Sequence, residues 1–175
     1  MIHIRPGTVT IRVKPVSLNK NEKQFIEDMK KWHYAEKDKF LKDKELFVLR
    51  NQSRGRGISF FDEGGFYPDF ILWLLCGDKQ YISFADPHGL EHSDGPNDSK
   101  IRFYEQIQNM EKQYLQDDSV ILNSFILSPT HHRDIQKKFC NWTKEEFREH
   151  HVFFLYDDAE SYISKLFADM IPILH

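Results

Sequence analysis

The middle of the chain consists of two short apolar runs joined by a turn. Residues 66–75 and 79–86 are apolar at positions of both parities, and Gly77 and Asp78 stand between them. A connection of this kind is typical of a tight β-hairpin. Strands that are apolar on both faces are usual in the interior of a covered sheet, so we expect the hairpin to lie at the centre of the fold.

Helical spacing begins after Asn19. This residue is a typical N-cap, Glu22 completes a capping box three positions later, and apolar residues follow at positions 25, 26, 29 and 32. Glu22 lies on the same face as this apolar stripe. It is therefore either a helix cap or a third carboxylate directed at a metal site.

Further strands and helices follow the same two periodicities. Strands are expected at 8–13, 45–50, 120–127 and 152–156, and helices from Asp98 or Ser99 to about 116, around 133–140, at 143–149 behind a capping box at Thr143, and at 159–170. The order around the hairpin is helix, three strands, helix and strand. This order predicts an α/β sandwich with a mixed sheet.

Composition is that of a globular domain. The 175 residues include 15 Phe, 7 Tyr and 3 Trp, enough for a sizeable core. We expect a single domain over 1–175, with its core at about 19–127 and C-terminal additions at 128–175, either complete or part of a longer protein. A formal net charge of −3 disfavours a globally basic, non-specific nucleic-acid binder and leaves a local basic patch open.

Cysteine usage and hydropathy indicate a cytoplasmic protein. With Cys76 and Cys140 as the two cysteines, reduced thiols are a simpler interpretation than a disulfide. We expect no signal peptide and no membrane association, because the longest apolar run, 70–76, is too short to span a bilayer. The sequence has no Walker A motif, so any ATP use would belong to another domain or subunit.

The hairpin contains two aspartates at positions where a charge is unfavourable, because the strands around them are apolar. Asp69 is near the start of the first strand, and Asp86 ends the second, followed by Pro87 and His88. Mg²⁺ or Mn²⁺ binds one or two carboxylates together with waters and phosphate oxygens. A titratable side chain two residues after the second aspartate can orient or deprotonate water. The spacing alone equally fits a strand-end turn with a buried, hydrogen-bonded Asp69.

Other basic and titratable residues are weaker candidates. Arg50, Arg54 and Arg56, with Gln52 among them, form either a phosphate-binding loop or a solvent-exposed one. Lys100 and Arg102 fit a solvated helix face better than a DNA contact. The histidine pairs at 131–132 and 150–151 and the thiol at 140 lack the spacing of a zinc site and fit exposed or capping positions.

The hairpin resembles the core of the PD-(D/E)xK nuclease superfamily. Pro68 and Asp69 match the first motif, and Asp86-Pro87-His88 stands where (D/E)xK is expected. The segments LRNQSRGRGISFF, GFYPDFILWL, KQYISFADPHGL, LNSFILS and HVFFLY resemble, more closely, the C-terminal endonuclease domain of type III restriction subunits and related DEAD/DEAH-box helicases. With the first helix, the resemblance covers most of the chain.

This resemblance implies a restriction-endonuclease-like αβββαβ core and Mg²⁺-dependent (or Mn²⁺-dependent) hydrolysis of DNA phosphodiesters by an endonuclease. It makes Asp69 and Asp86 metal ligands and adds Glu22, the acid that some members contribute from the first helix. The implied partners are double-stranded DNA, an ATP-driven helicase or translocase domain or subunit, and a DNA methyltransferase subunit of a restriction system. His88 replaces the motif lysine, so the alternative is a catalytically weak or inactive nuclease-like DNA-binding or assembly domain.

Overall fold

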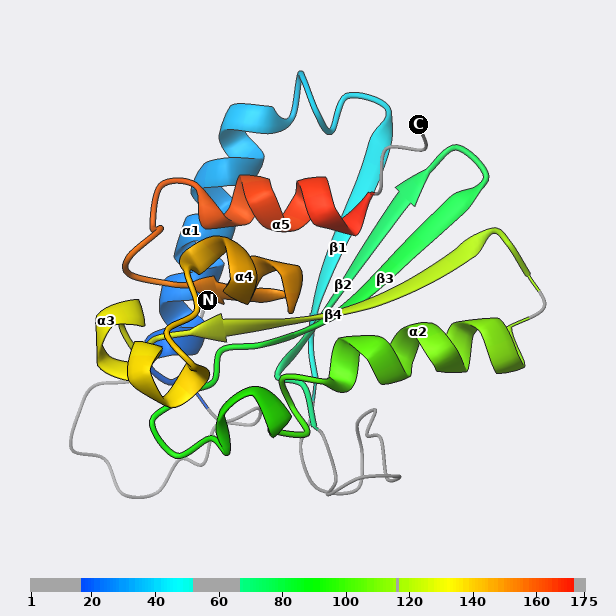
Figure 1. Ribbon diagram of the computed structural model, residues 1–175. Helices are drawn as coiled ribbons and strands as arrows, with labels where there is room; N and C mark the ends of the chain where they lie inside the picture. The colour runs from blue at the N-terminus through cyan, green and yellow to red at the C-terminus, as the bar shows by residue number, and fades with distance from the viewer. Residues whose placement is uncertain (1–16, 52–66, 116, 172–175) are drawn as a thin grey trace, which may run out of the picture.

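A five-stranded mixed sheet forms the centre of the computed structural model, which describes residues 17–51, 67–115 and 117–171 (Figure 1). The sheet has the order β1-β2-β3-β4-β5, with β1 Lys44–Arg50, β2 Phe70–Cys76, β3 Lys79–Asp86, β4 Val120–Ser128 and β5 Val152–Phe154. β1, β2 and β3 pair antiparallel, whereas β3, β4 and β5 pair parallel. The predicted α/β class with a mixed sheet is confirmed. The strand expected at 8–13 lies outside the described residues.

The register of the β2–β3 hairpin follows from its two-residue connection. Gly77 has a φ of 58°, a left-handed conformation that glycine adopts without steric penalty. The resulting ladder ends with Phe70 opposite Ala85. At the next position beyond this end of the ladder, Asp69 lies opposite Asp86. Side chains at directly opposite positions of an antiparallel pair have Cβ atoms about 5 Å apart, so the turn itself brings the two carboxyl groups together.

The helices among the described residues cover the sheet on both sides. They are α1 Lys20–Glu36, α2 Phe103–Tyr114, α3 His132–Ile135, α4 Lys144–Glu149 and α5 Tyr162–Met170, with 3₁₀ turns η1 Gly95–Asn97 and η2 Gln136–Phe139. α1 and α5 lie together on one face, and α2 runs along the other (Figure 1). Every helix within the described ranges is too short or too polar to cross a lipid bilayer.

Both predicted capping boxes are present. The Asn19 side chain accepts hydrogen bonds from the Glu22 and Asn21 backbone N–H groups, each at 2.9 Å, and the Glu22 carboxylate accepts one from the Asn19 N–H at 3.2 Å. Thr143 caps α4 in the same reciprocal way. These local signals lie within a single turn of chain, which is why the sequence predicted them correctly.

The predicted start of α2 is wrong. The expected caps, Asp98 and Ser99, lie in a turn, and α2 begins at Phe103 without a side-chain cap. The Asp98 carboxylate instead accepts hydrogen bonds from the backbone N–H groups of Lys100 at 2.9 Å and Asp94 at 3.1 Å. Asp98 therefore closes a turn that places Lys100 ahead of the helix and not on its solvated face.

The two faces of the hairpin are covered unequally. On the α1 and α5 side, Phe70 and Leu74 are fully buried, in a core that also contains Phe25 of α1. On the other side α2 buries Phe84, but Trp73 of β2 remains 38% exposed, beside Phe47 of the edge strand β1. The expectation that the hairpin is covered on both faces therefore holds near β3 and fails near β1.

The C-terminal segment contributes to the same sheet and core. β5 extends the parallel part of the sheet beyond β4. From α5, Leu166 and Phe167 are fully buried, and Phe167 stacks on Trp32 of α1 with ring centroids 4.1 Å apart. The packing of α5 against α1 thus connects the two ends of the described chain.

Candidate functional site at the strand ends

Two carboxyl groups meet where β2 begins and β3 ends. Asp69 immediately precedes β2, and Asn51 fixes its backbone: the Asn51 N–H donates to the Asp69 carbonyl and the Asn51 amide to the Pro68 carbonyl, both at 2.8 Å. Asp86 is the last residue of β3 and is 5% exposed. The side chains of Asp69 and Asp86 lie close enough for each to influence the protonation of the other. A carboxyl pair of this kind requires either a shared proton or a cation.

Burial and neighbouring negative charge raise the pKa of both carboxyl groups. Burial is the largest cause for Asp86, followed by the negative charge of Asp69, and together they raise the pKa of Asp86 to about 7. Burial also raises the pKa of Asp69, and the charge of Glu22 acts in the same direction. The pair is therefore short of positive charge when both members are ionised.

Lys100 brings a positive charge to the pair from the turn that Asp98 closes. Its ammonium lies 3.8 Å from Oδ2 of Asp86. The same ammonium lies 3.2 Å from Nε2 and 3.4 Å from Nδ1 of His88. The sequence interpretation missed this contact and assigned Lys100 to a solvated helix face. A lysine just ahead of an amphipathic helix is the only signal for it in the sequence, and that signal is weak.

The environment of His88 disfavours a positive charge on its ring. Burial is the largest cause that lowers the pKa of His88, and the adjacent Lys100 ammonium lowers it further, against the opposing charges of Asp98 and Glu91. The motif position that the resemblance assigns to a lysine is thus occupied by a ring whose charged form is disfavoured. The positive charge at this place in the structure comes from Lys100.

Glu22 caps α1, and its charge acts on the carboxyl pair; its role as a third metal ligand stays a prediction. It is 7% exposed, and its charge raises the pKa of both Asp69 and Asp86. Its oxygens are already engaged, accepting 2.9 Å hydrogen bonds from the Asn19 amide and from the Arg50 guanidinium. Glu22 therefore anchors Arg50, the last residue of β1, at the same edge of the sheet.

The proposed phosphate-binding loop is described only at its start. Arg50 donates to Glu22 and, at 3.5 Å, to the Ser17 carbonyl. Gln52, Arg54 and Arg56 lie outside the described residues, so their part in the predicted DNA-binding set remains a prediction.

The donor set at the strand ends is suited to a hard divalent cation. Within 17–51, 67–115 and 117–171, no three His, Cys, Asp or Glu side chains form a group arranged to hold a metal ion. The centre offers two carboxylates, Asp69 and Asp86, and Mg²⁺ commonly takes only one or two from the protein. A cation between them would supply the positive charge that their raised pKa values show to be lacking, so these residues fit the ion.

Three of the histidines weighed for a zinc site, His132, His150 and His151, pack against neighbouring residues. His132 Nε2 is bonded to the Trp142 carbonyl at 2.7 Å, and the His150 ring stacks on Trp142 at 4.3 Å. The His151 ring stacks on Phe125 and contacts the Ser124 carbonyl through Nδ1 at 3.0 Å. Their contacts are with carbonyls, with aromatic rings and, for His150, with the Tyr104 hydroxyl at 3.2 Å.

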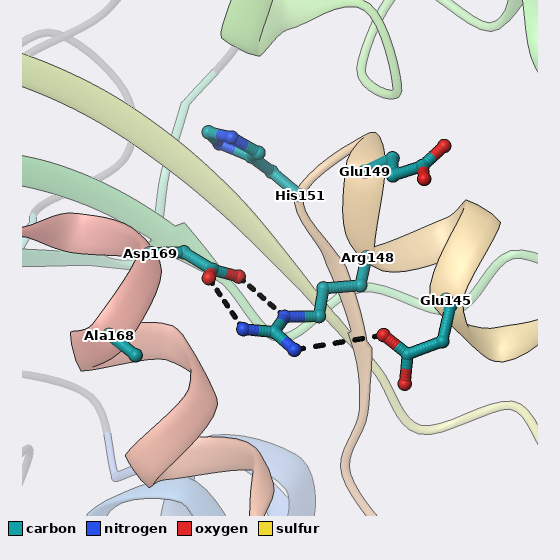
Figure 2. Close-up of a pocket in the computed structure, with 6 residues that line it drawn as sticks. All are labelled: Glu145, Arg148, Glu149, His151, Ala168 and Asp169. Carbon is teal, nitrogen blue, oxygen red and sulfur yellow. Dashed lines mark hydrogen bonds and ion pairs between the residues drawn. The ribbon is translucent and has the colours of Figure 1, made fainter. Parts of the chain in front are cut away.

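A separate concavity of about 470 Å³ lies between α4 and α5 (Figure 2). Its central cation, Arg148, is held by both oxygens of Asp169 at 2.7 and 2.8 Å and approaches Glu145 at 3.6 Å. Figure 2 shows the guanidinium directed toward these two carboxylates. Because its donors are committed to α5 and α4, this ion-pair network joins two helices.

Comparison of the chain with protein-family models, with curated proteins and with solved structures finds no match. The functional interpretation therefore rests on the geometry of the carboxyl pair and on the short segments quoted above.

Proposed function

We propose that the protein is a Mg²⁺-dependent endodeoxyribonuclease domain in which Asp69 and Asp86 hold the metal ion. The observation that carries this proposal is the pair of carboxyl groups at opposite strand positions, raised in pKa and flanked by the Lys100 ammonium. Paired carboxylates with perturbed pKa values occur preferentially at functional sites. The order α1-β1-β2-β3-α2-β4 also agrees with the αβββαβ core that the resemblance implies.

Phosphodiester hydrolysis requires charge stabilisation at the phosphate and removal of a proton from water. When bound, Mg²⁺ neutralises charge on the phosphate oxygens and lowers the pKa of a coordinated water. Asp69 and Asp86 bind the ion at the strand ends, and their ionised forms are stabilised by it. Lys100 stabilises negative charge that develops on the phosphate, because its ammonium lies beside Asp86.

His88 acts in this proposal as a positioning residue. Its neutral ring offers an acceptor nitrogen to the Lys100 ammonium, at 3.2 Å from Nε2. The contact holds the ammonium near Asp86 at the end of β3. Glu22 holds the Arg50 guanidinium in the same way, since its carboxylate oxygens accept hydrogen bonds from Asn19 and Arg50.

The macromolecular partners follow from the resemblance. Double-stranded DNA is the proposed substrate, and an ATP-driven helicase or translocase is the proposed partner, with a methyltransferase as the further subunit of a restriction system. The absence of a Walker A motif from the sequence agrees with ATP hydrolysis taking place elsewhere.

The test is cleavage of supercoiled plasmid by the purified chain in Mg²⁺ or Mn²⁺, with Asp69→Asn and Asp86→Asn beside the wild type. Asp78→Asn is the matched control, because Asp78 is an exposed aspartate at the other end of the same hairpin. We expect both site variants to lose cleavage and the control to retain it. Cleavage that survives both site substitutions would contradict the assignment.

Metal binding is measured separately by thermal unfolding at pH 8. A ligand that binds the folded state raises the melting temperature. Mg²⁺ is expected to stabilise the wild type and the Asp78→Asn control, and not Asp86→Asn. Metal-dependent stabilisation together with DNA binding but no cleavage would favour the alternative, a nuclease-like DNA-binding or assembly domain. If Mg²⁺ raises the melting temperature of neither the wild type nor the Asp78→Asn control, the proposed metal centre is wrong.

A further inference from the structure

The carboxyl ends of the parallel strands and the start of α1 meet at one edge of the sheet. The loop after β3 is joined to the end of β4 by the Leu90 N–H, which donates to Thr130 Oγ1 at 3.1 Å. The end of β5 is joined to α1 by the Tyr156 hydroxyl, which donates to Asn21 Oδ1 at 2.9 Å. Asn21 is next to Glu22 in the sequence, so this edge continues directly from the carboxyl pair. Ligands of open α/β sheets characteristically bind along such an edge.

A histidine with a fixed orientation stands on this edge. The Nδ1 of His131 is hydrogen-bonded to Oδ1 of Asp157, and Oδ2 of Asp157 accepts from the His132 N–H at 2.8 Å. Burial opposes ionisation of Asp157, but the hydrogen bonds from His131 and His132 outweigh it and lower the pKa of Asp157. Asp157 is thus a carboxylate acceptor, Nδ1 of His131 is the donor, and Nε2 is directed away from it. The His131 side chain is 42% exposed.

A lysine and this histidine both lie near the same tyrosine ring. Lys20 Nζ is 5.7 Å from the centroid of the Tyr156 ring, and the His131 ring is 6.2 Å from the same centroid. We call Lys20, Tyr156 and His131 the His131 strip. Both ends of the strip carry nitrogen donors, and its middle is an aromatic ring fixed through its hydroxyl to α1.

The acidic groups beside the strip are neutralised within the structure. Asp157 is paired with His131, and Asp158 with Lys144 at 2.9 Å. Lys20 is exposed and contacts the Tyr156 ring face. With His131 protonated, these groups therefore carry a net positive charge from Lys20, whereas the neighbouring Asp69 and Asp86 are acidic. A polyanion bound at the carboxyl pair through a cation would find its next favourable contact here.

We propose that the His131 strip binds the phosphate backbone of the nucleic-acid strand and sets its position relative to Asp69 and Asp86. This inference rests on the proposed function, since it takes a phosphodiester chain as the ligand. In its protonated form, the His131 ring donates through Nε2 to a non-bridging phosphate oxygen while Asp157 accepts from Nδ1, and Lys20 contributes a point charge. The Asp157 contact orients the ring before the ligand arrives and thereby reduces the ordering needed on binding.

The test is binding of a fluorescent DNA duplex to the full chain in EDTA, measured by anisotropy over a range of salt concentrations. The variants are Lys20→Gln, His131→Gln and the double variant. Each lost phosphate contact lowers the slope of log K against log salt by about 1, so we expect a decrease of about 1 for each single variant and about 2 for the double. The loss of affinity should be the same for unrelated DNA sequences.

The controls are Lys30→Gln and His33→Gln, which change the same residue types at exposed positions of α1. These positions lie about 15–20 Å along the helix from Lys20, at 1.5 Å per residue. Their salt slopes should equal that of the wild type. Lys20 is exposed, so Lys20→Gln is expected to fold normally. The test therefore remains informative even if the His131 variant unfolds.

The outcomes separate this inference from the proposed function. Wild-type binding with unchanged slopes in the strip variants would overturn the strip and leave the nuclease proposal standing. Reduced slopes in the strip variants, with undiminished binding by Asp69→Asn and Asp86→Asn, would support the strip whether or not those two variants abolish cleavage. Absence of DNA binding by the wild type in EDTA would overturn the strip, and the plasmid assay in Mg²⁺ would then decide the nuclease proposal separately.

Discussion

The ammonium of Lys100 lies 3.8 Å from Asp86 Oδ2 and 3.2 Å from His88 Nε2. The cation next to the carboxyl pair therefore comes from the turn before α2, whereas the position two residues after Asp86 holds a neutral imidazole. Where a sequence pattern lacks a lysine, a lysine from elsewhere in the fold can occupy the corresponding place. Whether the site works as proposed depends on this residue.

Replacing Lys100 tests its electrostatic role. Lys100→Met removes the charge and keeps much of the aliphatic chain, and we expect DNA cleavage to fall by about 10²-fold, the effect of losing one preorganised stabilising group. Adding His88→Lys to this variant should restore part of the activity, since it returns an ammonium to the same place. The measurement is the single-turnover cleavage rate.

Arg102→Met is the matched control for Lys100, because Arg102 is in the same turn but pairs with Glu105 at 3.2 Å. It should cleave at the wild-type rate. Equal rates for the wild type and Lys100→Met would show that the ammonium has no part in the reaction.

Replacing Asp86 should stabilise the protein at alkaline pH. The pKa of Asp86 is raised from its ordinary value of 3.8 to about 7 in the folded state, so the folded protein holds a proton that the unfolded chain has lost. The resulting stabilisation is fully present below about pH 4 and is lost as the pH rises through about 7. Asp86→Asn is neutral at every pH and retains a hydrogen-bond donor for Asp69.

At pH 8, without divalent metal, Asp86→Asn should therefore exceed the wild type in free energy of unfolding by on the order of 2–4 kcal/mol, and near pH 4 the two should converge. Urea unfolding at several pH values measures this difference. A constant difference across the whole range would mean that Asp86 is not the group with the raised pKa.

A buried serine without a hydrogen-bond partner provides a prediction independent of function. Among the described residues, the hydroxyl of Ser83 in β3 is buried and unpartnered. Ser83→Ala removes this unsatisfied group, and we expect it to raise the free energy of unfolding by about 1 kcal/mol.

Ser128 supplies the matched comparison. It is also fully buried, but its hydroxyl donates to the Thr130 carbonyl at 3.1 Å and accepts from the Thr130 N–H at 3.2 Å. Ser128→Ala should therefore lower the free energy of unfolding by about 1–3 kcal/mol. The same sign for both substitutions in urea unfolding would contradict the hydrogen-bond assignment.

Cys140 occupies a backbone conformation that favours glycine. It ends η2 with a φ of 53° and is exposed, so its side chain contributes little packing. Cys140→Gly should raise the melting temperature. The free energy of unfolding should rise by up to about 1 kcal/mol, a figure that already allows for the greater chain entropy of glycine in the unfolded state. Cys140→Ala keeps the unfavourable conformation and should leave the melting temperature nearly unchanged. A lower melting temperature for the glycine variant would refute this account.

The sequence predicted the elements whose signals are local. The capping boxes at Asn19 and Thr143 each lie within one turn of chain, and both are present. The two-residue connection at Gly77 fixes the hairpin register, and that register alone places Asp69 opposite Asp86. The mixed α/β sheet followed from the order of these elements.

The start of α2 and the position of Lys100 were not predictable in this way. Asp98 is an equally good residue for a helix cap and for a turn, and the sequence contains no feature that chooses between them. In the structure α2 packs through Phe103 and Ile107 against Phe84.

The sequence by itself thus determined the carboxyl pair, because a short turn and strand alternation are properties of consecutive residues. The tertiary structure alone decided what surrounds the pair. Lys100 reaches Asp86, Arg50 reaches Glu22 and Asp157 reaches His131 across separate elements. Such contacts depend on how helices and strands pack, and packing is set by the shape of the whole core rather than by any local pattern.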